Sequence, residues 1–200
     1  MSRPVGIHYQ GDLRRALLEV AAEAIATSGP EGVSLRQLAR TLGVSHAAPA
    51  HHFGDKTGLL TAVAVEGFER FSAHLAAALI AMGPAEPVEI LLTLAKAYSE
   101  FADDEPGYFD IMFLPALIRV DDPAYIAAGD EAFAALRSVI DGCQMLGWRP
   151  QHDPLTLSAA AWSMAHGVAV LRRHGSLVRH YPNGDLNGVA AIVASLIGHD

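Results

Sequence analysis

Between Ser34 and Lys56 the chain reads SLRQLARTLGVSHAAPAHHFGDK, which predicts two short helices, a tight turn between them, and the start of a third. Ser34 and Gln37 form an S-x-x-Q capping box, a signature of helix starts. Apolar residues then recur at helical spacing until Gly43, which supplies the left-handed residue that ends many helices. Ser45 is the predicted cap of the second helix. A helix, a glycine-containing turn and a second helix together form the arrangement that places its second helix in a DNA major groove.

Outside this stretch the apolar residues also recur at helical spacing, and no alternating strand pattern of useful length is present. Asp55 and Asp153 are predicted helix caps, and prolines open several helices at the first turn, where proline is tolerated. We therefore expect an all-α fold of about nine helices. The helices predicted outside the opening stretch cover residues 12–28, 55–82, 87–101, 106–113, 123–146, 153–171 and 186–197, with a loop over 174–184.

Composition and charge limit the class of protein. The chain has 200 residues, is 51% hydrophobic and has a net charge of −8, so it is rich enough in apolar residues to bury a sizeable core. Residues 1–60 carry six Lys/Arg against five Asp/Glu, whereas the other 140 residues carry eight against seventeen. DNA contact is therefore expected only at the N-terminal part. The sequence shows no signal-peptide segment and no apolar run near 20 residues, and it has one cysteine, so we expect a soluble cytoplasmic protein.

The opening stretch resembles the DNA-binding domain of TetR-type transcriptional regulators. The resemblance covers residues 13–60 and includes Gly32-Val33-Ser34, the pattern L-x-x-x-A-R-x-L-G-V-S, His52-Phe53, and Asp55-Lys56 before an apolar pair. The C-terminal part is similar to a subgroup with a Trp…His-Gly signature, here Trp162 and His166-Gly167. The resemblance implies a homodimeric regulator, most simply a repressor, that leaves a palindromic operator when a small hydrophobic effector binds. It divides the chain into a DNA-binding domain, 1–55, and a ligand-binding and dimerisation domain, 56–200, joined by the long fourth helix.

Carried over position by position, the resemblance implies a set of DNA contacts. Backbone contacts are expected from the start of the second helix, from the end of the recognition helix and from the start of the fourth helix. The recognition helix departs from the family pattern, because Pro49 lacks an N–H and its three alanines cannot hydrogen-bond to base edges. With Ser45 as cap, Pro49 would lie one turn in and could kink the helix. The predicted contacts are Ser34, Arg36, His46, Ala47, Ala48, His51, His52 and Lys56.

Two further sites are expected in the C-terminal domain. Trp162 and His166 lie four residues apart on one helix face and are candidates for the effector pocket, together with Phe109 and Met112. For Trp162 and His166, ordinary core packing is an expectation at least as strong as the pocket, and for Phe109 and Met112 it is the stronger one. The last two helices carry apolar stripes that can pair with those of a second subunit as a four-helix bundle. These stripes comprise Leu157, Ala161, Met164, Val168, Leu171, Leu186, Val189, Val193 and Ile197.

The same sequence also has to be compared with the patterns of metal-binding proteins and enzymes. His46, His51 and His52 have spacings that do not bring them onto one helix face for a metal, so we expect no metal site and no cofactor. The chain contains no Gly-rich phosphate loop, nucleophile elbow or HExxH helix, so we do not expect an enzyme. The alternative is a helical small-molecule-binding protein or enzyme that uses Trp162 and His166 and does not bind DNA.

Overall fold

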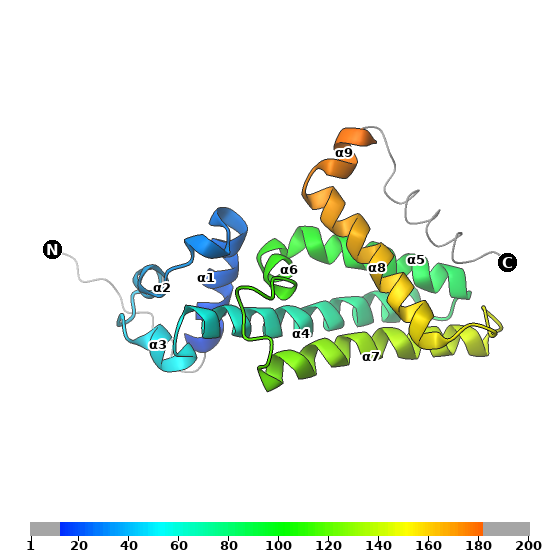
Figure 1. Cartoon of the computed structure of the whole chain (residues 1–200), viewed down its shortest axis with the longest axis horizontal. Coiled ribbons are helices and arrows are strands. Elements are labelled where there is room, and N and C mark those ends of the chain that lie inside the picture. The colour runs from blue at the N-terminus through cyan, green and yellow to red at the C-terminus, as the bar shows by residue number, and fades with distance from the viewer. Residues whose placement is uncertain (1–12, 182–200) are drawn as a thin grey trace. The chain divides into compact units, whose positions relative to one another are not determined.

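The computed structural model describes residues 13–181, and all of their regular structure is helical (Figure 1). Proline starts four of these helices, as the sequence predicts, and Asp153 caps α8 by accepting the N–H of Thr156 at 2.8 Å. The all-α prediction is confirmed. In chain order the elements are α1 (Leu13–Ser28), the 3-10 turn η1 (Pro30–Gly32), α2 (Leu35–Thr41), α3 (Ala48–Phe53), α4 (Lys56–Met82), α5 (Pro87–Asp104), α6 (Pro106–Met112), α7 (Pro123–Met145), α8 (Pro154–Arg173) and α9 (Ser176–His180).

The described residues form two compact units, and each unit combines two separate stretches of the sequence. The first unit contains residues 13–68 and 106–127, and the second contains residues 69–105 and 128–181. Helices α4 and α7 each contribute residues to both units. The helix-turn-helix segment therefore shares its unit with α6 and with the connection from α6 to α7. A functional boundary at residue 55 remains a prediction.

The first unit is held together by the packing of α1 on α6, with α2 and α3 also against α1. Periodic apolar residues on each helix fill the interior, which is the packing that the sequence pattern predicts. Side chains at the centre of this core are almost completely buried: Leu17, Leu18, Ile25, Leu38, Leu59, Val63, Ile111 and Met112.

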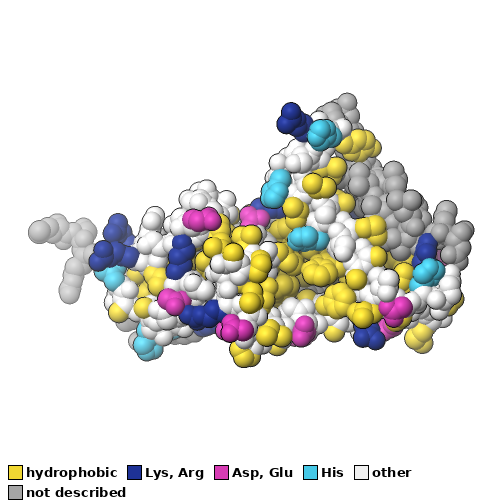
Figure 2. All heavy atoms as spheres, viewed as in Figure 1, with side chains coloured by type: hydrophobic (Ala, Val, Ile, Leu, Met, Phe, Trp, Pro, Cys, Tyr) yellow, Lys and Arg dark blue, Asp and Glu magenta, His cyan; other side chains and the backbone are white. Residues whose placement is uncertain are grey.

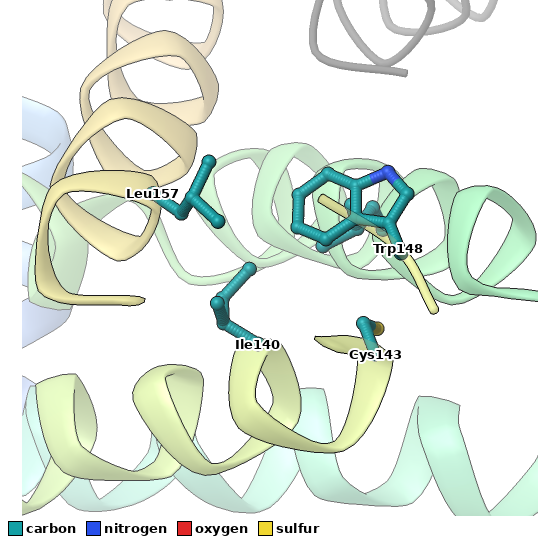
Figure 3. Close-up of a cluster of buried hydrophobic side chains, with 5 residues drawn as sticks. Ile140, Cys143, Trp148 and Leu157 are labelled. Atoms are coloured by element: carbon teal, nitrogen blue, oxygen red, sulfur yellow. The ribbon is translucent and has the colours of Figure 1, made fainter. Parts of the chain in front are cut away.

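The second unit has a hydrophobic cluster where α5, α7 and α8 meet the α7–α8 connection (Figure 3). Leu91, Ile140, Cys143, Trp148 and Leu157 form this cluster, and each is at most 8% exposed. Burial raises the pKa of the Cys143 thiol, so the thiol stays protonated and its reactive thiolate is scarce. These contacts join segments that lie up to 66 positions apart in the sequence and fix α8 at its N-terminal end.

Several predicted boundaries differ from those in the structure. Helix α7 runs through Gly129 without a break and ends at Met145, one residue before the predicted end. The loop predicted over 174–184 contains the short helix α9. The final helix predicted over 186–197 and the first residue of the helix predicted over 12–28 lie outside the described residues.

Candidate nucleic-acid interface

The turn between α2 and α3 differs in detail from the predicted one. Gly43 has a φ of 68°, as expected for a left-handed residue that ends a helix, and the N–H of Val44 donates to the carbonyl of Ala39 at 2.9 Å. Ser34 occupies the N-cap position of α2, but its side chain makes no capping hydrogen bond. The prediction that the Ser34 side chain forms a capping hydrogen bond is therefore wrong, although α2 starts where expected.

Helix α3 begins later than predicted, because the chain first makes an extra turn. The N–H of Ala48 donates to the carbonyl of Ser45 at 3.0 Å, and Ala47, not Ser45, is the N-cap residue. Pro49 therefore lies in the first turn of a six-residue helix, where a backbone N–H has no intrahelical partner to lose. The kink that we considered at Pro49 has no cause here, and the buried proline ring packs inward.

The predicted DNA contacts lie together in the first unit, and most of them are exposed. Ser34, Arg36 and His46 are exposed, as are Ala47, His51 and His52, whereas Ala48 and Lys56 are half-buried. On the face drawn in Figure 2, several dark blue Lys and Arg side chains lie at the α1–α2 part of this unit, with Asp and Glu side chains nearby. The Lys56 ammonium donates to the carbonyl oxygen of Glu31 at 2.7 Å, so its position is set by η1.

Arg40 is a second exposed cation on α2 that the site prediction did not include. It follows Arg36 by four residues, so both guanidinium groups lie on one face of the helix. Within residues 13–181 neither arginine forms an ion pair. The i, i+4 spacing was the sequence signal that could have identified Arg40.

The start of α4 carries the second feature that the sequence did not reveal. Asp55 accepts the N–H of Gly58 at 2.7 Å, which confirms it as the cap of α4. Its carboxylate also accepts two hydrogen bonds from Nη2 of Arg119, at 2.8 and 2.9 Å. The N–H of Gly58 and the positive charge of Arg119 together hold the pKa of Asp55 below its usual value. Arg119 is 64 residues away in sequence, and no local pattern marks it.

A candidate effector site lies in the second unit. The hydroxyl of Tyr98 on α5 and Nδ1 of His166 on α8 are 2.8 Å apart, and Trp162 contacts the Phe133 ring at a centroid distance of 6.0 Å. Burial raises the pKa of Tyr98, with a hydrogen bond from Trp162 acting in the opposite direction. Burial also lowers the pKa of His166, so this imidazole is neutral near pH 7. Sequence reasoning identified Trp162 and His166 but did not include Tyr98 or Phe133 in the site.

The other two pocket candidates belong to the first unit. Phe109 is 3% exposed and Met112 is completely buried, and the side chain of Met112 lies directly against Gly67. Their side chains fill the core of that unit, whereas Trp162 is 39% exposed.

The predicted subunit-interface residues divide into two groups on α8, and four more lie outside the described residues. Ala161, Met164 and Val168 are partly exposed, and Leu171 is 49% exposed. Leu157 differs, because it is 7% exposed and belongs to the cluster in Figure 3, which leaves little of its surface for a second subunit. The residues outside the described part are Leu186, Val189, Val193 and Ile197.

Helix α8 is strongly apolar, yet most of its residues are not buried. It is the one helix in residues 13–181 that is long and apolar enough, by length and composition, to cross a membrane, and only 17% of its apolar window is buried. Core helices of soluble proteins also pass this test, but they are mostly buried. In the same part of the chain, no three His, Cys, Asp or Glu side chains are grouped as metal ligands.

Two parts of the chain match models of known protein families. Residues 17–63 match the model of bacterial regulatory proteins of the tetR family, and residues 91–195 match that of the tetracyclin repressor-like C-terminal domain. The chain is 23% identical to the uncharacterized HTH-type regulator YobS of Bacillus subtilis, over 80% of this chain and 79% of that protein. It is 36% identical to the regulator BetI of Rhizobium meliloti over 46% of this chain and 45% of BetI.

Solved structures share the fold over almost the whole chain. A protein of unknown function from Rhodococcus sp. RHA1 is 29% identical, has a TM-score of 0.82, and covers 98% of this chain and 97% of its own. The structure of AibR with isovaleryl coenzyme A and operator DNA has a TM-score of 0.63 at 21% identity, over 92% and 95% of the two chains.

Proposed function

The chain belongs to the TetR family of transcriptional regulators, and we propose that it is a cytoplasmic repressor that binds a palindromic operator as a homodimer and is released by a small hydrophobic effector. One observation carries the DNA-binding part of this proposal. The exposed cations of α2 and the exposed histidines of α3 lie in one compact unit, and the two α2 arginines form no ion pairs within residues 13–181.

The proposed contacts divide into backbone and base readout. Ser34 and Arg36 at the start of α2, His51 and His52 at the end of α3, and Lys56 at the start of α4 contact phosphates, which fixes the register of the head on the duplex. His46 is the polar candidate for a base edge, and Ala47 and Ala48 offer methyl groups to thymine. Because this direct readout is sparse, DNA shape contributes to specificity.

Phosphate contacts are tested by the salt dependence of binding. Arg36→Ala removes one exposed cation without breaking an ion pair, so we expect weaker binding to all sequences alike and a salt slope smaller by about one. The measurement is retardation of the DNA flanking the coding region, titrated over a range of salt concentrations. Lys56→Ala should act in the same direction, although it also removes the bond to the Glu31 carbonyl.

Arg137→Ala is the matched control, because Arg137 is an exposed arginine on α7 in the second unit. It should leave both affinity and salt slope unchanged. If wild-type protein retards no flanking DNA at any salt concentration, the regulator proposal fails and the helical small-molecule-binding alternative takes its place. A loss restricted to one operator sequence would instead make Arg36 a base-reading residue.

The effector site is proposed around Tyr98, Trp162 and His166, of which Trp162 and His166 belong to the Trp…His-Gly pattern noted in the sequence. The aromatic rings offer apolar walls, and the neutral imidazole offers a polar anchor, which is the usual composition of a small-molecule site. In AibR the same fold holds both operator DNA and isovaleryl coenzyme A, so the fold can combine the two functions. Phe109 and Met112 stay as weaker candidates, since both are packed in the first unit.

Helix α8 is the proposed subunit interface. Its partly exposed stripe of Ala161, Met164, Val168 and Leu171 leaves apolar area uncovered within the described part of the subunit. Among the described residues, no atom lies within 4 Å of a Cβ added at Gly167 beside this stripe, so residues 13–181 leave room there for a partner helix. A second copy of the same face would complete a four-helix bundle, in which Leu186, Val189, Val193 and Ile197 are expected to take part.

A further inference from the structure

We propose that Arg119, in the connection between α6 and α7, is a positioning residue for DNA binding that fixes the junction between α3 and α4 through Asp55. This inference rests on the proposed function, because it concerns how the head is presented to DNA. No part of the sequence motif contains Arg119, and the nearest residue of that motif in space, Asp55, is 64 positions away.

The connection between α6 and α7 is attached to the start of α4 at two points. The backbone N–H of Arg119 donates to the hydroxyl oxygen of Thr61 at 2.9 Å. That hydroxyl donates in turn to the carbonyl of Thr57 at 2.8 Å, and Thr61 is only 3% exposed. The neighbouring Ile118 is 7% exposed, so the segment is anchored by a buried side chain as well. The backbone of Arg119 is therefore fixed against α4.

The second attachment lies at the junction that follows the recognition helix. Nη2 of Arg119 donates to both carboxylate oxygens of Asp55, while Asp55 caps α4 through the N–H of Gly58. The backbone N–H of Asp55 donates to the carbonyl of Phe53, the last residue of α3, at 3.0 Å. One residue thus links the end of α3, the first turn of α4 and Arg119.

The space around Gly58 shows how closely these groups meet. A Cβ at Gly58 would lie 2.1 Å from the carbonyl oxygen of Phe53 and 2.9 Å from Nη1 of Arg119. The carbonyl at the end of α3 and the guanidinium of Arg119 therefore both lie against the backbone of α4 at Gly58. This contact lies wholly within the first unit.

The Asp55–Arg119 pair adds little to the stability of the fold and little to the attraction between protein and phosphate. The side chains of Arg119 and Asp55 are 43% and 61% exposed, and exposed ion pairs contribute little to stability. The carboxylate also cancels the charge of the guanidinium, so the pair adds no net attraction for DNA. What the pair does provide is a directional, charge-assisted connection at the point where α3 passes into α4.

The direction in which Asp55→Asn changes operator affinity shows whether the pair acts by positioning α3 or by its charge. Asp55→Asn keeps a good helix cap and removes one negative charge from the DNA-binding unit. Charge alone predicts tighter operator binding, whereas loss of positioning predicts weaker binding. We expect operator affinity to fall about tenfold for Asp55→Asn and for Arg119→Gln, with the salt slope unchanged and a thermal midpoint close to wild type.

The double variant tests whether the two residues act as one element. If they do, Asp55→Asn with Arg119→Gln binds no more weakly than either single variant, and Arg119→Lys recovers part of the loss. Glu19→Gln is the charge-matched control, because it removes one carboxylate from an exposed pair on α1 in the same unit. It should bind as tightly as wild type or slightly more tightly.

Three results would overturn the inference: wild-type or tighter binding by Asp55→Asn, a salt slope smaller by about one for Arg119→Gln, or multiplied losses in the double variant. The second result would make Arg119 a phosphate contact. If Asp55→Asn failed to fold, the Arg119 variants, whose Asp55 cap is intact, would decide the question. Failure of the wild-type protein to bind its flanking DNA would refute the proposed function itself, and the two failures are therefore distinguishable.

Discussion

At Gly107, near the start of α6, the backbone of one helix lies against the backbone of another. A Cβ added at this position would be 1.9 Å from the carbonyl oxygen of Ala22 on α1 and 2.6 Å from its carbonyl carbon. Both atoms belong to the backbone, so a side-chain rotation cannot relieve the overlap. The packing of α1 on α6, which is central to the first unit, therefore depends on a residue without a side chain.

Gly107→Ala should lower the free energy of unfolding by about 1–3 kcal/mol, because α6 must move away from α1 to make room for the methyl group. The measurement is urea denaturation followed by circular dichroism. Gly142→Ala on α7 is the control, since an added Cβ there meets no atom of residues 13–181 within 4 Å. Alanine is the better helix former, so this control should be neutral or more stable by up to about 1 kcal/mol. Equal midpoints for the two variants would contradict the close approach.

His166 gives the stability of the protein a dependence on pH. Burial lowers its pKa below the usual 6.5, so between the two values the unfolded chain takes up a proton more readily than the folded chain does. The contribution of His166 is therefore fully present above about pH 6.5 and is lost as the pH falls through the lowered pKa. The Tyr98 hydroxyl at Nδ1 is compatible with the neutral ring, because that nitrogen can then accept the hydrogen bond.

His166→Gln should remove this dependence, since the glutamine carbonyl can accept from Tyr98 but does not titrate. We expect the urea midpoint of wild type to fall more than that of the variant between pH 7.5 and 5.5. His152→Gln, which changes an exposed histidine in the α7–α8 connection, should keep the wild-type response. Parallel midpoints for wild type and His166→Gln would show that the imidazole is not held neutral by the fold.

At the scale of helices, the sequence predicted the helical type better than the ends of the helices, and it missed α9 inside a predicted loop. The 3.6-residue period of apolar side chains identified α1, α4, α5, α7 and α8, although little of the apolar window of α8 is buried in the described part of the chain. The start of α3 was predicted at Ser45, since serine is a good cap, but the chain makes a turn from Ser45 to Ala48 first. Whether a hydroxyl caps a helix depends on the local backbone path, which composition alone does not determine.

Contacts between residues that are distant in the sequence could not be predicted from local sequence patterns. The Tyr98–His166 pair joins residues 68 positions apart, and Arg119 reaches Asp55 over 64 positions. Helical period places Tyr98 on the apolar face of α5 but does not show which polar atom meets its hydroxyl. An exposed arginine in a loop has no periodic neighbours at all, so only the packing of α6 and α7 brings Arg119 to α4.

At the scale of the whole molecule, regulation requires that the second unit influence the first. Helices α4 and α7 are continuous through residues of both units, and Arg119 lies four residues before α7 begins. An effector that binds one conformation of the second unit more tightly shifts operator affinity by that difference, typically about 1–3 kcal/mol. The covalent paths for such coupling enter the DNA-binding unit at the start of α7 and along α4.

Operator binding by two heads also requires a stable dimer, and Val168 on α8 is the position at which to test it. Val168→Glu places a carboxylate in the proposed apolar interface, where its desolvation opposes association, so we expect a folded monomer by sedimentation and circular dichroism. Because each head would then bind its half-site alone, operator affinity should fall by roughly a hundredfold or more. Ile80→Glu is the matched control, since Ile80 is 82% exposed on α4 and the same charge there should leave the dimer intact. A Val168→Glu protein that is folded and still dimeric would exclude this face of α8 as the interface, and the apolar surface of α8 would then need another partner.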